Sequence, residues 1–217
     1  MPALYSVAKR RARCSYCRPF RTGGLSSIAP NGKSFRITVK REPDGVVSNW
    51  LDDRVELSAT LKVSVPAGEF FLAYKPERPG VLLIMDVGLT PVISMLEKAA
   101  KGAVSVTIHY IHGTLDGSTH AIGAQVRRLA ERTANISATT FYVEPRADDV
   151  RGRDYNERGL ITGDWLRKQL PVAGADFHLC GPKPFLPAFV GELTLAGVPA
   201  DRLHYQFFGP TDELIAA

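Results

Sequence analysis

The stretch that decides the fold is residues 81–101, VLLIMDVGLTPVISMLEKAAK. An apolar run stops at Asp86, and a helical pattern begins after it. Apolar side chains then recur every three or four residues, at Val92, Met95, Leu96 and Ala99. The pattern predicts Thr90 as the N-cap of this helix and Pro91 as its first residue. A buried strand, a tight turn and a helix N-terminus can bind an anion, but the same pattern fits a plain strand–helix turn equally well.

The second half of the chain repeats this alternation. Beside the strand at 81–85, the pattern predicts strands at 104–112, 136–143, 177–180 and 204–208. It predicts further helices at 119–133, 163–170 and 184–196. Strands and helices that alternate at this spacing indicate a parallel sheet with helices on both faces. Ligands of such sheets bind beyond the carboxyl ends of the strands, so the loops at 86–91, 112–117 and 181–184 are candidate binding loops.

The first third of the chain has a different pattern. Residues 34–40 alternate between apolar and polar side chains, which predicts a half-buried strand. A second alternation predicts a strand within 57–65, a third and short strand is predicted at 69–72, and a short helix at 46–54. Residues 74–80 contain two prolines and are interpreted as a linker. This region therefore reads as a small antiparallel unit.

The composition is that of a globular protein. The chain has 217 residues, of which 45% are hydrophobic and 23% are charged, enough for one large or two small domains. Basic residues between positions 9 and 21 supply much of the net charge of +5. We interpret this segment as a solvated N-terminus, with an organelle-targeting presequence or a nucleic-acid-binding arm as alternatives. The long apolar run at 80–96 is interrupted by Asp86, Gly88 and Pro91, so we expect no membrane as partner. A basic arm without a recognition fold is a weak signal, so we expect no nucleic acid as partner either. The expected location is cytoplasmic.

The cysteines and histidines do not predict a metal site. Cys14 and Cys17 have CxxC spacing, but no second pair of ligands accompanies them. His109 and His112 lie three apart on a predicted strand and therefore point to opposite faces. Cys180 ends a predicted strand and precedes Gly181, which leaves room for a planar ring. A buried structural cysteine explains the same pattern.

Several longer segments, taken together, resemble one family. They are residues 29–42 (APNGKSFRITVKRE), 45–49 (GVVSN), 66–71 (PAGEFF), 175–182 (ADFHLCGP) and 204–210 (HYQFFGP). Over residues 21–210 the chain resembles the reductase portion of flavohaemoproteins, the nitric oxide dioxygenases, and more widely the ferredoxin–NADP reductase superfamily. The resemblance implies an α+β protein of two domains. A truncated antiparallel FAD-binding β-barrel would occupy 21–75, and a parallel-sheet NAD(P)H-binding α/β domain 80–217, after an unassigned basic N-terminus at 1–20.

The resemblance also implies the cofactors, FAD with NADH or NADPH, and the route of electrons from nicotinamide through flavin to haem in a separate globin. The residues that would bind the flavin are Arg21, Thr22, Gly23, Gly24, Val46, Val47, Ser48, Phe207, Phe208, Gly209 and Pro210. Those that would hold the dinucleotide pyrophosphate are Asp86, Val87, Gly88, Leu89, Thr90 and Pro91. Cys180, Gly181 and Pro182 would flank the nicotinamide. The candidate catalytic residues are Cys180, Gln206 and Phe208.

The chain departs from the family pattern at positions that would touch cofactors. Gly23 and Gly24 stand where the family has a tyrosine and a serine beside the flavin, and Gln206 replaces a glutamate. Leu115 replaces an arginine suited to the adenosine phosphate. Asp86 replaces the first glycine of the nucleotide loop, and its charge would repel a pyrophosphate by roughly 1–4 kcal/mol at about 4 Å.

These departures leave more than one function open. The leading hypothesis is a flavin-dependent oxidoreductase domain that uses NAD(P)H. The alternative is a non-catalytic or cofactor-impaired remnant of such a reductase, with an unrelated arginine-rich head joined near Arg21. A third and weaker hypothesis is an interaction module that uses the basic head.

Overall fold

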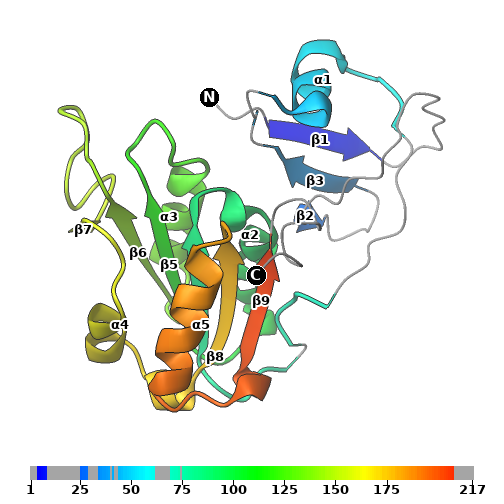
Figure 1. Cartoon of the computed structure of the whole chain (residues 1–217). Helices are drawn as coiled ribbons and strands as arrows, with labels where there is room; N and C mark the ends of the chain where they lie inside the picture. The colour runs from blue at the N-terminus through cyan, green and yellow to red at the C-terminus, as the bar shows by residue number, and fades with distance from the viewer. Residues whose placement is uncertain are drawn as a thin grey trace. The chain divides into compact units, whose positions relative to one another are not determined.

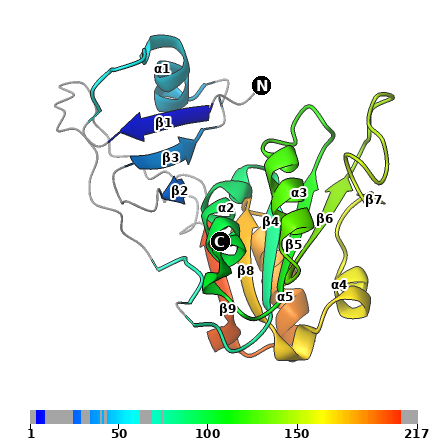
Figure 2. The same cartoon turned by 180° about the vertical axis from the view of Figure 1, so that it is seen from behind.

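The computed structural model describes residues 4–8, 25–28, 34–39, 41, 44–61, 69–73 and 75–207. The chain divides into two compact units, Met1–Glu69 and Phe70–Ala217 (Figures 1 and 2). The predicted linker at 74–80 lies within the second unit by this division. The assignment of residues 1–20, 21–75 and 80–217 to separate functional domains stays a prediction.

The larger unit is built on a six-stranded sheet in which every pair of neighbouring strands is parallel. Its strands are β4 (Gly80–Met85), β5 (Ile108–Thr114), β6 (Ile136–Tyr142), β7 (Glu157–Arg158), β8 (Asp176–Gly181) and β9 (Leu203–Phe207). Their order across the sheet is β7-β6-β5-β4-β8-β9. The predicted parallel α/β sheet is therefore confirmed, although β5 begins four residues later than expected, at Ile108 rather than Val104.

Helices cover both faces of this sheet, as predicted. α2 (Leu89–Lys98) and α3 (Gly123–Arg132) pack on one face, and α4 (Gly163–Gln169) and α5 (Phe185–Leu195) on the other (Figures 1 and 2). In β4, Val81 and Leu83 face α4 and α5 while Leu82 and Ile84 face α2 and α3, and all four side chains are fully buried. Burial on both faces explains why this strand reads as a continuous apolar run rather than an alternating one.

The start of α2 differs from the prediction. The helix begins at Leu89 after a short 3-10 turn, η1 (Asp86–Gly88), so Gly88 is its N-cap and no side chain caps it. The prediction that Thr90 caps the helix is wrong, because Thr90 is already inside the first turn and buried. Pro91 is accordingly the third helical residue, where its missing N–H group still removes no hydrogen bond within the helix.

The ends of the other elements vary by a few residues. α2 passes into a π turn, η2 (Ala99–Ala103), where Gly102 has a φ of 76°. Lys98, in the last turn of α2, donates to the main-chain oxygens of Leu72 and Ala73. α3 begins at Gly123 rather than at residue 119, because the preceding residues form turns and Ile122 is left-handed, with a φ of 55°. Two further 3-10 turns precede β8 and β9, η3 (Val172–Gly174) and η4 (Ala200–Arg202).

The smaller unit contains an antiparallel sheet of β1 (Leu4–Ala8), β2 (Leu25–Ile28) and β3 (Ser34–Thr38) in the order β1-β3-β2. The strand at 34–40 and the helix at 46–54, observed as α1 (Val46–Arg54), are confirmed. The sequence did not predict β1. The strand predicted at 69–72 is wrong, since these residues are irregular. Residues 57–61 are likewise not in a strand, and the rest of that predicted strand lies outside the described residues.

No helix in the part of the chain that the structure describes is long and apolar enough to cross a membrane. Within the same ranges, no three His, Cys, Asp or Glu side chains group together in a way that could hold a metal ion.

Candidate functional site

The order of the strands places a switch point between β4 and β8. From β4 the chain proceeds to β5, β6 and β7 on one side, and it then returns to β8 and β9 on the other side. In open α/β sheets, ligands bind in the crevice beyond the carboxyl ends of the strands at such a point. The turn at Asp86–Gly88 follows β4, and Gly181 ends β8. The structure therefore brings two of the three candidate loops together at the switch point.

The turn after β4 has a left-handed first residue. Asp86 has a φ of 50°, a conformation that glycine adopts readily and that aspartate tolerates better than most other residues. The position where the family pattern has glycine therefore still has the backbone torsion that favours glycine. The main-chain oxygen of Asp86 lies 3.2 Å from Nε2 of His112 on β5, which ties the turn to the neighbouring strand.

Gly88 packs the turn directly onto the end of β8. A Cβ atom at this position would overlap the main-chain carbonyl group of Cys180. Gly181 is equally confined, since a Cβ atom there would lie 2.7 Å from the ring of Phe185. The next residues of the predicted pyrophosphate loop, Leu89 to Pro91, form the buried first turn of α2. The N-terminus of α2 has no side-chain cap, so its main-chain N–H groups can bind an anion.

Cys180 is fully buried, on the face of β8 that packs against α2. Burial raises the pKa of its thiol to about 12, so the group stays neutral and is no nucleophile. Gln206 of β9 lies opposite Cys180 in the parallel register, and Phe207 lies opposite Gly181. Four residues from the predicted nicotinamide and flavin sites thus meet at adjacent strand ends.

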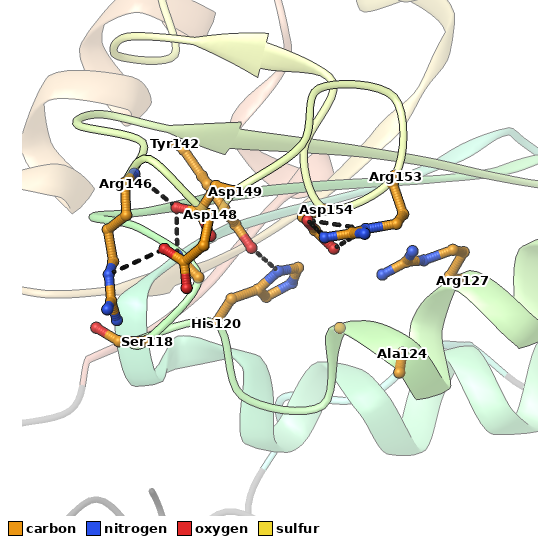
Figure 3. Close-up of a pocket in the computed structure, with 12 residues that line it drawn as sticks. Ser118, His120, Ala124, Arg127, Tyr142, Arg146, Asp148, Asp149, Arg153 and Asp154 are labelled. Carbon is orange, nitrogen blue, oxygen red and sulfur yellow. Dashed lines mark hydrogen bonds and ion pairs between the residues drawn. The ribbon is translucent and has the colours of Figure 1, made fainter.

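A polar pocket of about 340 Å³ lies at the carboxyl ends of β5 and β6, beside the start of α3 (Figure 3). Its walls come from the loops after these two strands and from the first turns of α3. The lining residues are Gly117, Ser118, His120, Gly123, Ala124, Arg127, Tyr142, Arg146, Asp148, Asp149, Arg153 and Asp154. Of these residues, only Gly117 lies in a loop that was predicted to bind a ligand. A position in the loop after a predicted strand was also the available signal for the other lining residues, because the loop after β6 is rich in arginine and aspartate.

Most charges in the pocket are paired with one another. Arg153 forms an ion pair with Asp154 at 2.7 Å, and Arg146 with Asp148 at 3.4 Å (Figure 3). Arg127 differs, because it has no hydrogen bond or ion pair with any residue in the described ranges. Its guanidinium group is therefore the cation best placed to meet an added anion.

Asp149 joins the two loops that form the pocket. One carboxylate oxygen accepts hydrogen bonds from the main-chain N–H of Gly117, at 3.2 Å, and of Arg146, at 2.8 Å. The first partner belongs to the loop after β5 and the second to the loop after β6. A Cβ atom at position 117 would collide with this carboxylate, so Gly117 is needed for the close approach.

A buried histidine, His112, and a half-buried one, His120, connect the turn at Asp86 to the pocket. Nδ1 of His120 lies 2.9 Å from the hydroxyl oxygen of Tyr142, and the ring centroids of His112 and His120 are 5.2 Å apart. Burial lowers the pKa of His112 to about 3 and that of His120 to about 4, so both rings are neutral near pH 7. His112 was predicted to begin a candidate binding loop and not to bind a metal, whereas no pattern in the sequence singled out His120.

The candidate flavin residues lie in several places. Val46, Val47 and Ser48 form the first turn of α1, which no side chain caps, so their main-chain N–H groups can face an anion. The Ser48 hydroxyl donates to the main-chain oxygen of Gly45 at 3.1 Å. The remaining candidates lie outside the described residues: Arg21, Thr22, Gly23, Gly24, Phe208, Gly209 and Pro210.

Comparison with known proteins agrees with this geometry. A family model described as the oxidoreductase NAD-binding domain matches residues 87–190. A flavohemoprotein of Xylella fastidiosa (strain 9a5c) is 47% identical over 192 residues, which are 88% of this chain and 47% of that protein. A flavohemoprotein of Bacillus cereus (strain ATCC 10987 / NRS 248) is 36% identical over 193 residues, 87% of this chain and 48% of that protein. The chain spans about half the length of these curated relatives.

This chain covers a larger share of one solved structure than of these relatives. The flavohem-like FAD/NAD-binding domain of nitric oxide dioxygenase from Vibrio cholerae O1 biovar El Tor is 32% identical, with a TM-score of 0.76. The match covers 88% of this chain and 77% of that one. The chain therefore contains an oxidoreductase NAD-binding domain and belongs to the family of the reductase portion of flavohaemoproteins.

Proposed function

We propose that this chain transfers electrons from NADH or NADPH through FAD to a one-electron acceptor such as haem. The observation that carries the proposal is the switch point between β4 and β8, where Gly88 packs against the carbonyl of Cys180 at the carboxyl ends of the strands. An uncapped helix start, a glycine turn and a polar pocket beside it fit an extended dinucleotide.

The larger unit would bind the nicotinamide nucleotide along this edge. The main-chain N–H groups of the turn and of the start of α2, residues 86–90, would hold the pyrophosphate, with Pro91 beside them. The pocket beside α3 would take the adenosine half, with Arg127 as the available cation. Cys180, Gly181 and Pro182 would flank the nicotinamide, and the neutral thiol of Cys180 would contribute its shape and apolar character rather than a charge.

The smaller unit would contribute to an FAD site of barrel type. There the first turn of α1 would hold the flavin pyrophosphate, together with Arg21 and its neighbours Thr22, Gly23 and Gly24. Gln206 and the segment Phe207–Pro210, with Phe208 against the ring, would complete the flavin contacts. The nicotinamide would supply a hydride and the flavin would release electrons singly, whereas the protein positions both rings and excludes water. The haem would belong to a globin, and the expected location is cytoplasmic.

A test of this proposal needs only the purified full chain. Titration with FAD is expected to give a bound flavin spectrum, and the complex is expected to reduce a dye acceptor with NADH or NADPH. A protein that binds no FAD and reduces no dye would overturn the proposal. The cofactor-impaired remnant remains the second candidate because Asp86 puts a carboxylate into the pyrophosphate turn. The remnant is expected to bind FAD without reducing the dye, or to do neither.

A further inference from the structure

A chain of aromatic side chains connects the pocket to the turn at Asp86. Tyr142, at the end of β6, lines the pocket, and its hydroxyl oxygen is 2.9 Å from Nδ1 of His120. The ring of His120 lies 5.2 Å from that of His112, centroid to centroid. Nε2 of His112 lies 3.2 Å from the main-chain oxygen of Asp86. These contacts span two strands, so they link segments that are far apart in the sequence.

The main-chain oxygen of Asp86 determines which ring nitrogen of His112 carries the proton. A main-chain carbonyl oxygen accepts hydrogen bonds and cannot donate them, so Nε2 of His112 must carry the proton. His112 is fully buried and neutral, and its Nδ1 is therefore an acceptor. This Nδ1 atom is buried and has no hydrogen-bond partner among the described residues.

The hydroxyl of Tyr142 likewise determines which ring nitrogen of His120 carries the proton. Tyr142 is a buried phenol whose pKa is raised by burial, so its hydroxyl keeps its proton and can donate to Nδ1 of His120. Nε2 of His120 then carries the proton, yet this atom too is buried without a partner in the described part of the chain. One ring thus presents an unused donor and the adjacent ring an unused acceptor. Unpaired buried polar atoms are costly, and one water between these two nitrogens would satisfy both.

We propose that Tyr142, His120 and His112 form a hydrogen-bond relay with a single direction, and that the two histidines are positioning residues for the pyrophosphate turn. The relay donates from Tyr142 to His120, from His120 through one bridging water to His112, and from His112 to the carbonyl of Asp86. It holds the left-handed turn in the shape that directs main-chain N–H groups to the nucleotide. It also places the pocket and the turn, the two ends of the binding edge, in one hydrogen-bonded network. The role in nucleotide binding rests on the proposed function, whereas the relay itself does not.

The relay can be tested on the full chain by long-range proton–nitrogen NMR of its histidine side chains at pH 7.5. The expected spectrum shows His112 and His120 neutral, each protonated on Nε2. Protonation of His112 on Nδ1 would overturn the proposal. Because this measurement needs no nucleotide, it decides the relay even if the protein binds neither NADH nor NADPH, the result that would defeat the proposed function instead.

Variants test the positioning role through the dissociation constant of NADH, measured by its fluorescence. His112→Leu removes the donor to Asp86 and is expected to weaken binding about tenfold, whereas His112→Gln offers an amide N–H in its place and is expected to recover most of the loss. Tyr142→Phe is expected to weaken binding and to shift the His112 resonances. The control is Tyr155→Phe, which removes the hydroxyl of the ring stacked on Tyr142 but outside the relay. Equal binding by the Leu and Gln variants, or by the two Phe variants, would refute the positioning role.

Discussion

Gly88 lies so close to Cys180 that a Cβ atom at position 88 would overlap the Cys180 carbonyl group. Gly88→Ala must therefore push the turn away from the end of β8. We expect it to lower the free energy of unfolding by about 1–3 kcal/mol, as overpacking of a close contact does. We also expect it to abolish detectable NADH binding, because the pyrophosphate turn moves. Urea unfolding and a fluorescence titration measure the two effects.

Gly191 offers a matched control for this variant. It lies inside α5, and nothing within 4 Å would meet an added Cβ atom. Gly191→Ala is therefore expected to raise stability by about 0.5–1 kcal/mol through helix propensity, without changing nucleotide affinity. If the two alanine variants had the same stability, the close contact at Gly88 would be wrong.

Asp86→Gly is expected to improve both stability and nucleotide binding. Glycine removes the cost of a left-handed residue, on the order of 1 kcal/mol, and it removes the carboxylate from the pyrophosphate site. Loss of the repulsion should tighten NADH binding at least tenfold, since about 1.4 kcal/mol corresponds to a factor of ten. Affinity is read from fluorescence and stability from thermal unfolding.

Asp86→Asn separates the two contributions. Asparagine tolerates the left-handed conformation about as well as aspartate but carries no charge. We expect Asn to recover the gain in affinity without the gain in stability. Unchanged affinity in both variants would show that the side chain of Asp86 does not face the nucleotide.

Arg127→Ala tests which nucleotide the pocket prefers. If the adenosine half lies in the pocket, Arg127 is the cation available to a 2′-phosphate. We expect the variant to weaken NADPH binding about tenfold and NADH binding much less, because only NADPH carries that phosphate. Arg128→Ala, on the exposed side of the same helix, is the control and should change neither affinity. Equal losses for both nucleotides would argue against a phosphate contact.

Stability should decline below neutral pH because two buried histidines and one half-buried histidine are held in the neutral form. Burial lowers the pKa of His112 to about 3, and those of His120 and His178 to about 4, from an ordinary value of 6.5. As pH falls from 6.5 towards 4, the unfolded chain binds protons that the folded chain does not, so folding is disfavoured. Each such histidine contributes a slope of up to about 1.4 kcal/mol per pH unit.

Other groups act on these histidines and on the pH range. A coulombic interaction with Arg127 lowers the pKa of His120 further, while Asp154 and Asp149 oppose it. His120 adds to the lowering at His112, and the carbonyl of Asp86 opposes it. Three carboxylates with lowered pKa contribute stability that is lost only below their ordinary value of 3.8: Asp116, Asp154 and Asp164. Urea midpoints between pH 7.5 and 4.5 should therefore report the histidines, with a smaller slope in His112→Gln. A midpoint that stays constant over this range would contradict the assignment.

The larger unit could be predicted because its elements follow simple periodicities. A strand buried on both faces leaves an unmistakable apolar run, and an amphipathic helix such as α2 leaves its own spacing. The start of α2 was misplaced because Thr90 and Pro91 fit the local rules for a helix start, whereas the packing of Gly88 on β8 moves the start towards the strand. β1 was missed because its pairing with β3 is a long-range contact without a local pattern.

The candidate site was predictable where it lies next to a strand end. The turn at Asp86 and the segment at Cys180 could be found from the sequence, since the first directly follows a buried strand and the second lies at the end of one. The pocket could not be predicted, because its walls come from segments that are far apart in the sequence and adjacent only in the fold, such as those at Arg127 and Asp154. His120 lacked any signal for the same reason, since its partners Tyr142 and His112 lie on separate strands.

The carboxylate of Asp149 is shared by two loops that leave different strands, through the N–H groups of Gly117 and Arg146. An insertion or deletion in either loop would shift the bond that shapes the other. The lengths of these loops are therefore expected to change together among natural variants of this domain. Engineering of nucleotide preference should accordingly exchange both loops as one cassette, with Asp149 and Gly117 kept.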